Sequence, residues 1–239
     1  MSSEIEKDFM HHGHDHSCCG TGSFLQEILY HLPYAVFSVA FCFLVVSFFS
    51  YTTIGSKDIK GIEKGADILF HSFHFMHILF SVIGSLVTYF RFSNRLLRGF
   101  FVGMFSAMVF CTLSDAVMPY IAGRILGVRM DFHLCFFNEL DKIVPFLIGG
   151  LVTGVIIGRY HKKSEVFYSV FSHFLHILVS SFASMFYLIA NGFSDWYTQI
   201  GFVFIFLVIA VVVPCVMSDI VTPMVFAKVE KKNARNKNM

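Results

Sequence analysis

The sequence predicts an all-α membrane protein with six transmembrane helices, arranged as two inverted repeats of three helices. Three observations lead to this fold class. Only 14% of the 239 residues are charged, against about 25% in a typical soluble domain. Long stretches carry no charge at all, and motifs from the first half of the chain recur in the second half in the same order. This composition excludes a soluble globular enzyme, a disordered chain and a nucleic-acid binder.

The uncharged stretches give the helices in order. Stretches without Asp, Glu, Lys or Arg, or with one aspartate only, cover residues 33–54, 68–90, 99–122, 143–158, 166–190 and 197–227. About 18 uncharged residues suffice for a membrane-spanning helix. The stretch 143–158 is short, but Lys142 and Arg159 at its ends can extend towards the membrane surface. Residues 24–32 are expected to extend the first helix backwards.

The basic residues predict the orientation. Six spans place both termini on one side of the membrane, and that side then holds twelve of the 18 lysines and arginines. The positive-inside rule therefore predicts cytoplasmic termini. The first ten residues contain three acidic residues and one lysine, which is unlike a cleavable signal peptide. We expect a multi-pass integral protein of a bacterial inner membrane, in contact with lipid.

Internal repetition is the most informative feature. Residues 74–81 (HFMHILFS) match residues 173–180 (HFLHILVS) at six of eight positions, and residues 111–119 match 215–223 at Cys, Ser, Asp, Val and Pro. Glutamates six residues before a proline open both halves. The predicted organisation is a tail at 1–23, repeat 1 at 24–122, a loop at 123–136, repeat 2 at 137–227 and a basic tail at 228–239. An odd number of spans per repeat inverts the second copy, as in many secondary transporters.

The repeated ionisable residues predict two metal-binding clusters on either side of the membrane midplane. Counting 1.5 Å per helical residue places them at matching depths. The outer cluster is expected to contain His74, His77, Asp115 and Glu139, and the inner one His173, His176, Asp219 and Glu27. Accessory roles are expected for Cys111, Cys215, Ser114, Ser218, Pro119 and Pro223. The sequence leaves open whether the clusters form two sites or one bimetallic site.

The residue types point to a divalent transition metal. Histidines at positions i and i+3 share one helix face, and imidazole with carboxylate suits Zn²⁺, Fe²⁺, Co²⁺, Ni²⁺ or Mn²⁺. A charged residue inside a membrane is costly and usually marks a pathway. Pro119 and Pro223 lack an N–H group, so each is expected to free the backbone carbonyl of the aspartate four residues earlier. The alternative is that Asp115 and Asp219 only tie the helices together. His71 has no counterpart in the second repeat and is interpreted as structural or accessory.

The N-terminal tail adds a second group of potential ligands. Four histidines and two cysteines lie within nine residues, a composition typical of a flexible metal-binding tract. These residues are His11, His12, His14, His16, Cys18 and Cys19.

The leading functional hypothesis is a proton-coupled secondary transporter for a divalent transition metal, and therefore no enzyme. One alternative is a b-type cytochrome with one haem held by histidines of the second and fifth spans. Another is a membrane metalloenzyme, since such enzymes also use His-x-x-His pairs. The identity of the metal, the direction of transport and the oligomeric state, including a homo-oligomer, stay open.

Overall fold

The computed structural model describes residues 24–53, 58–130, 132, 139–160, 165–193 and 195–237, and the elements within them are all helical. Six helices are long and apolar enough to cross a membrane. They are Phe24–Thr52, Ile59–Phe92, Leu96–Ile125, Leu140–Arg159, His173–Ala190 and Trp196–Asn233. The predicted all-helical fold with six spanning helices is therefore confirmed.

The elements follow the predicted order. The first three spans are α2 (Phe24–Thr53), α3 (Ile59–Phe92) and a composite helix of α4 (Leu96–Thr112), the π-helical η1 (Leu113–Val117) and α5 (Met118–Ile125). The last three are α7 (Leu140–Tyr160), α8 (Glu165–Ala190) and a composite of α9 (Ile200–Val216), the π-helical η4 (Met217–Val221) and α10 (Thr222–Lys237). A short 3₁₀ helix, η3 (Trp196–Gln199), precedes α9. Residues 24–32 do belong to the first helix, as expected.

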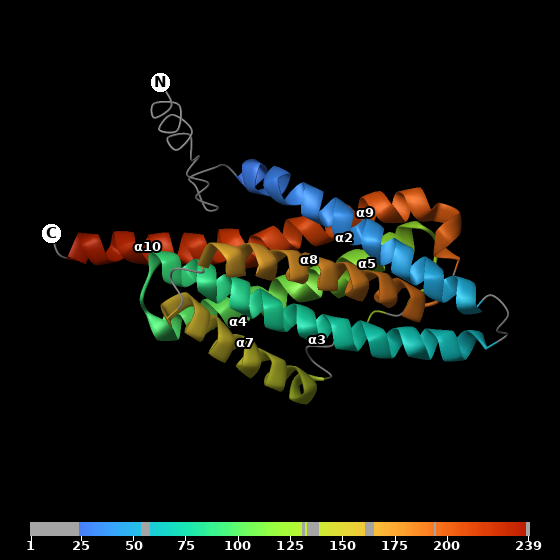
Figure 1. The fold of residues 1–239 in the computed structure, drawn as a ribbon, viewed down its shortest axis with the longest axis horizontal. Coiled ribbons are helices and arrows are strands. Elements are labelled where there is room, and N and C mark those ends of the chain that lie inside the picture. The colour runs from blue at the N-terminus through green and yellow to red at the C-terminus, as the bar shows by residue number, and fades with distance from the viewer. Residues whose placement is uncertain are drawn as a thin grey trace, which may run out of the picture.

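Helices α3 and α8 form the centre of the bundle. They pack against each other over most of their length, and they are the two most buried spans. Helix α2 covers α8 and α9, whereas α7 covers α3 (Figure 1). The histidines that these two helices carry, His74 and His77 of α3 and His173 and His176 of α8, are accordingly buried.

Small residues let α7 lie close to α3. Gly150, Gly154 and Gly158 are spaced by four residues and face α3. A Cβ atom at Gly154 would lie 2.8 Å from a side-chain carbon of Leu86, and one at Gly150 would lie 2.9 Å from the Leu79 carbonyl oxygen. This spacing of small residues is typical of close helix packing in membranes.

A π-helical turn interrupts each composite helix at the same place in the two halves. In η1 the Met118 N–H donates to the carbonyl of Leu113, and in η4 the Thr222 N–H donates to that of Met217. Each bond spans five residues instead of four. Such turns insert one extra residue and often occur at functional sites. The third residue of each turn is an aspartate, Asp115 or Asp219.

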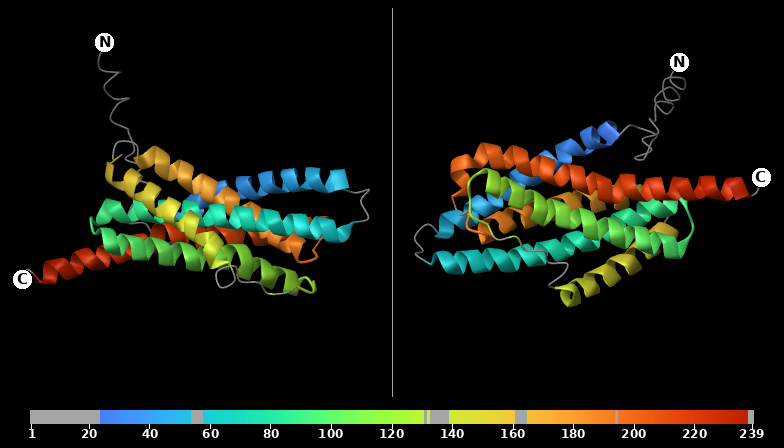
Figure 2. Two further views of the ribbon diagram at one scale, coloured as in Figure 1. Left: turned by 90° about the horizontal axis from the view of Figure 1, so that it is seen from below. Right: turned by 180° about the vertical axis from the view of Figure 1, so that it is seen from behind.

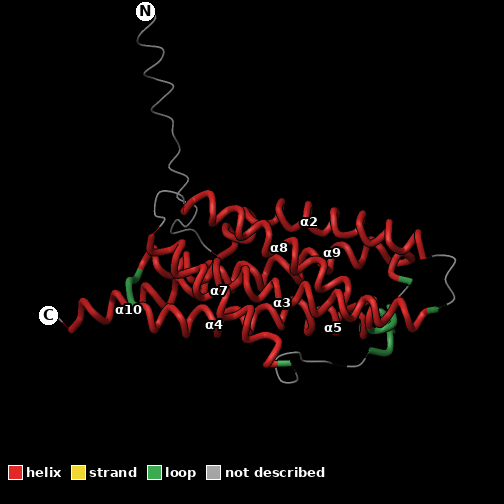
Figure 3. The backbone as a smooth tube through the Cα atoms, turned by 60° about the horizontal axis from the view of Figure 1, so that its bottom comes forward, coloured by secondary structure: helices red, strands yellow, loops and turns green. Residues whose placement is uncertain are grey.

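The loops gather at the two ends of the bundle. Gly127 and Gly192 have positive φ angles of 80° and 89° and follow the ends of α5 and α8, where a left-handed residue commonly ends a helix. Helix α10 ends beyond the bundle, on the side of the α3–α4 turn (Figure 2). Figure 3 shows the helices running along one axis between these loop regions. The start of α2 and the end of α10 lie towards the same end (Figure 1).

Candidate metal centre

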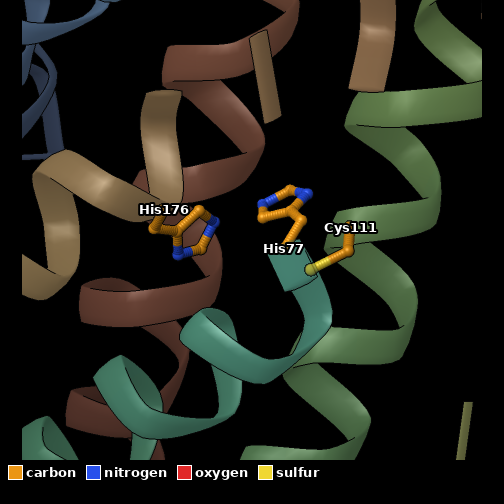
Figure 4. A group of neighbouring side chains, drawn as sticks. All are labelled: His77, Cys111 and His176. Carbon is orange, nitrogen blue, oxygen red and sulfur yellow. The ribbon is translucent and has the colours of Figure 1, made fainter. Parts of the chain in front are cut away.

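The centre of the molecule holds two histidines that face each other across the α3–α8 interface. His77 of α3 and His176 of α8 lie edge to face, with ring centroids 4.3 Å apart. Cys111 of α4 lies beside them, and one ligand atom from each of these three residues lies within 4.8 Å of the others (Figure 4). Cys215 of α9 contributes a second sulfur, 3.7 Å from His77 Nε2. Each of these four residues is buried.

The cluster that was predicted as the outer one is built around Asp115. Its Oδ2 atom accepts hydrogen bonds from Nδ1 of His74 at 2.9 Å and from Nδ1 of His77 at 2.6 Å. Its Oδ1 atom accepts from the hydroxyls of Ser114 at 2.7 Å and Ser180 at 2.8 Å. Asp115 is fully buried, so these four bonds replace the hydration that the carboxylate would have in water.

The cluster that was predicted as the inner one is built around Asp219 and has fewer hydrogen bonds. His176 Nδ1 donates to Asp219 Oδ2 at 2.7 Å. His173 Nε2 lies 3.8 Å from the same oxygen, beyond hydrogen-bond distance. The Ser81 hydroxyl reaches Asp219 Oδ1 at 3.4 Å and Ser218 Oγ at 2.6 Å. Each aspartate thus meets histidine from its own half and serine from the other half.

The aspartates orient the two central histidines. An ionised carboxylate can only accept hydrogen bonds, so the Nδ1 atoms of His77 and His176 carry the protons. Their Nε2 lone pairs are then left for another partner. His176 Nε2 has no hydrogen-bond partner among the described residues. A histidine held by a carboxylate at one nitrogen and presenting the other is the usual arrangement at a protein metal site.

The expected role of the two prolines needs correction. Because η1 and η4 are π-helical, the missing N–H of Pro119 falls opposite the carbonyl of Ser114, five residues earlier, and not opposite that of Asp115. The Ser184 hydroxyl instead donates a hydrogen bond to the Ser114 carbonyl at 3.0 Å. In the same way, Pro223 leaves the carbonyl of Ser218 without a backbone N–H donor. The hydroxyls of Ser85 and Ser106 both donate to that carbonyl at 2.8 Å.

Both glutamates lie apart from the clusters to which they were assigned. The Glu139 carboxylate contacts Lys142 Nζ at 2.9 Å and His71 Nε2 at 3.3 Å. Glu27 uses its backbone carbonyl to accept a hydrogen bond from His31. Within the described residues, its carboxylate makes no hydrogen bond or ion pair with the inner cluster. Counting residues along a helix does not give the side of the helix on which these groups lie.

The two predicted clusters meet at the centre of the bundle. The contact between His77 and His176 joins the group around Asp115 to the group around Asp219, so the structure shows one continuous centre of histidine, cysteine and aspartate. His74 and His173 lie at its two ends, beside Asp115 and Asp219 respectively. This arrangement brings the sequence-predicted His77, His176 and Cys111 together, with Cys215 beside His77.

Several contributing residues were not predicted. Ser85 and Ser184 follow the repeated octapeptides by four residues in both halves, so extending the repeat by one turn would have found them. His31 has no counterpart at the equivalent position 143, and repetition could not reveal it. Gly84 is a further case. A Cβ atom there would lie 2.7 Å from Asp219 Cγ, so only glycine lets this carboxylate rest against α3.

The N-terminal tract with its six candidate ligands lies outside the described residues. It therefore stays a prediction from composition.

No family model, no curated protein and no solved structure matches the chain. The geometry of the centre is consequently the basis for a functional assignment.

Proposed function

We propose that the protein is a secondary transporter that moves a divalent transition-metal ion across a membrane in exchange for protons. The six spans support a multi-pass membrane protein in contact with lipid. The further assignments, namely cytoplasmic termini, a bacterial inner membrane and a transporter instead of an enzyme, belong to this proposal.

The observation that carries the proposal is the group of His77, Cys111 and His176 at the centre of the helix bundle. Nitrogen and sulfur ligands of one tetrahedral Zn²⁺ ion lie about 3.5 Å apart, given metal–ligand bonds of about 2.0–2.3 Å. The corresponding atoms here lie within 4.8 Å of one another, so a small inward movement of the side chains would close them around an ion. Imidazole with thiolate favours zinc and related metals over Mg²⁺ or Ca²⁺.

Burial favours transport over a permanently open channel. His77 and Asp115 are 0% exposed, and His176 is 1% exposed. An ion reaches such a site only when the surrounding helices move. Binding sites of secondary transporters lie at the midplane between repeats, where broken helices contribute, and the repeats rock around them. The π-helical turns η1 and η4 flank this centre in the present structure.

The hydrogen bonds support coupling to protons. Metal ions and protons compete for the Nε2 lone pairs of His77 and His176, and a thiol must lose its proton before it binds a metal. Ion binding therefore releases protons, and an opposing proton gradient can drive transport. Asp115 and Asp219 keep a negative charge beside the bound metal ion or the bound protons. This charge lowers the free-energy cost of holding a cation in the membrane.

The haem alternative fits the centre poorly. Two histidines that ligate one haem iron from opposite faces place their ring centres about 6 Å apart, with the porphyrin between them. The rings of His77 and His176 are 4.3 Å apart, and α3 packs directly on α8 at this point. A haem there would require these two central helices to separate.

The decisive experiment is metal flux in proteoliposomes. Vesicles with the full-length protein and an internal metal-sensitive dye should take up Zn²⁺, Co²⁺ or Mn²⁺ faster than protein-free vesicles. The rate should rise when the vesicle interior is more acidic than the medium. Replacing His77 with glutamine should abolish metal-dependent uptake, because it removes a central ligand.

A matched control is Leu79→Met, two residues further along α3, which preserves bulk and polarity. This variant should transport normally. Full metal flux in the His77→Gln protein would reject the transporter assignment at this centre. An intense haem absorption band in the washed, purified protein would favour the cytochrome instead.

A further inference from the structure

A histidine outside the repeated motifs extends the centre towards its inner end. His31 of α2 is 5% exposed, and its Nδ1 atom lies 2.7 Å from the carbonyl oxygen of Glu27, one turn earlier. A carbonyl can only accept, so Nδ1 carries the proton and Nε2 carries the lone pair. Metal-binding histidines are commonly held in this way by a backbone carbonyl.

The His31 ring lies next to His173 of α8. The two ring centroids are 5.4 Å apart, and the rings are tilted by 43°. Two imidazoles that bind one ion through nitrogens at about 2.0–2.1 Å place their ring centres about 5 Å apart at the tetrahedral angle. The observed separation of the ring centres is therefore compatible with two ligands of a single ion after rotation of the side chains.

Asp219 has acceptor capacity for a third ligand bond because its oxygens are not saturated with hydrogen bonds. Asp115 accepts four hydrogen bonds of 2.6–2.9 Å. Asp219 accepts one at 2.7 Å and one at 3.4 Å. An ionised carboxylate has about four lone-pair positions, so Asp219 has capacity that its counterpart lacks. His173 Nε2 lies 3.8 Å from Asp219 Oδ2, whereas in the outer half His74 is hydrogen-bonded to its aspartate.

We propose that His31, His173 and Asp219 form a second metal site, on the inner side of the central one. Two imidazoles and one carboxylate are a ligand set for Zn²⁺, Fe²⁺ or Mn²⁺. The site rests on the proposed transport function, in which it holds an ion that leaves or approaches the centre at the end where α2 begins. The outer half has no equivalent, since position 143 is an isoleucine. The pathway is therefore asymmetric.

Metal content and cobalt spectra of the full-length protein test this site. His31→Gln removes the imidazole but keeps a side chain of similar size. After equilibrium dialysis against Zn²⁺, this variant should hold one ion fewer per chain than the wild type. When Co²⁺ replaces Zn²⁺, the cobalt–thiolate absorption of the central site should remain in His31→Gln and weaken in Cys111→Ser. The N-terminal tract is identical in all variants, so differences between them report on the bundle.

Tyr34→Phe is the matched control, because its ring lies one turn further along α2, 6.3 Å from His31. It should keep the wild-type metal content. Unchanged metal content in His31→Gln would overturn the inner site. Joint loss of that ion and of the cobalt–thiolate band would also overturn it, because His31 would then belong to the central site. Failure of the transport function would show separately, as full flux in His77→Gln.

Discussion

His77 and His176 lie on different helices, 99 residues apart, yet their rings meet edge to face at 4.3 Å. Each is anchored at Nδ1 by the aspartate of its own half. This contact turns two half-sites into one centre. If both histidines bind the same ion, replacing either one with glutamine removes most of the binding, and replacing the second adds little. Residues that act as a unit show this non-additivity.

The double-mutant comparison requires metal affinities of His77→Gln, His176→Gln and the combined variant, measured by competition with a chelating dye. We expect the combined loss to be clearly smaller than the sum of the two single losses. Additive losses would mean that the histidines bind different ions.

Asp115 orients His74 and His77, so its replacement should weaken metal binding without abolishing it. Asp115→Asn keeps the shape of the side chain but removes the charge that fixes both imidazoles. Loss of a residue that supports a ligand typically weakens metal affinity about 10–100-fold. We therefore expect the Asn variant to keep the wild-type metal stoichiometry and to bind more weakly by that factor. Titration with Zn²⁺ checks both quantities, and loss of a bound ion at saturation would identify Asp115 as a direct ligand.

Gly84 determines where the Asp219 carboxylate lies. In Gly84→Ala the new Cβ would lie 2.7 Å from Asp219 Cγ, closer than atoms can approach. The carboxylate must therefore move, and His176 loses its anchor. We expect metal affinity to fall about 10–100-fold although every ligand is still present. Gly65→Ala on the same helix is the control, because nothing lies within 4 Å of its Cβ position. Equal affinities of the two alanine variants in a chelator competition assay would contradict the prediction.

Ser184 compensates for the N–H group that Pro119 lacks. Ser184→Ala leaves the Ser114 carbonyl without the hydroxyl that reaches it at 3.0 Å. Hydrogen bonds between membrane helices contribute about 0.6–2 kcal/mol each, so the variant should be destabilised by that amount. Pro119→Ala restores an N–H group opposite this carbonyl. Thermal unfolding in detergent should therefore show a smaller effect of Ser184→Ala in the Pro119→Ala background, whereas equal effects would refute the compensation.

The hydrophobic pattern and the repeated motifs predicted the six spans and most of the central residues. Uncharged stretches locate helices because a bilayer requires them to be long and apolar. The repeated His and Asp residues stood out because charges inside such helices are costly. Depth along the helix follows from counting at a fixed rise per residue. For these reasons His77, His176, Asp115 and Asp219 could be identified from the sequence.

Other features of the site depend on helix rotation, helix register and tertiary packing, which cannot be obtained by counting residues along a helix. The direction in which Glu27 and Glu139 point depends on how α2 and α7 rotate against their neighbours. Which carbonyls lose their donor at Pro119 and Pro223 depends on the π-helical hydrogen-bond register, and no local sequence motif predicts that register. His31 has no histidine at the equivalent position of the second half, so the internal repeat could not point to it. Tertiary packing, which brings α2 onto α8, is what places it beside His173.

Glu230 joins helix α10 to the turn between α3 and α4. This buried carboxylate of α10 accepts hydrogen bonds from Tyr89 at 2.6 Å and Ser93 at 2.9 Å. Arg95 and Arg98 also contact it, at 2.7 Å and 3.1 Å. Both arginines are more than half exposed, so water weakens their contribution, and the two hydroxyl bonds should dominate.

Glu230→Gln keeps the size of the side chain but turns charge-assisted bonds into neutral ones. Hydrogen bonds to charged groups contribute about 1.5–3 kcal/mol, against about 1 kcal/mol for neutral pairs. We therefore expect the variant to lose about 1–2 kcal/mol of stability, seen as a lower melting temperature in detergent. Lys231→Gln, an exposed change of charge at the next residue, should melt like the wild type. If both variants melt at the same temperature, the contacts of Glu230 do not stabilise the attachment of α10 to the α3–α4 turn.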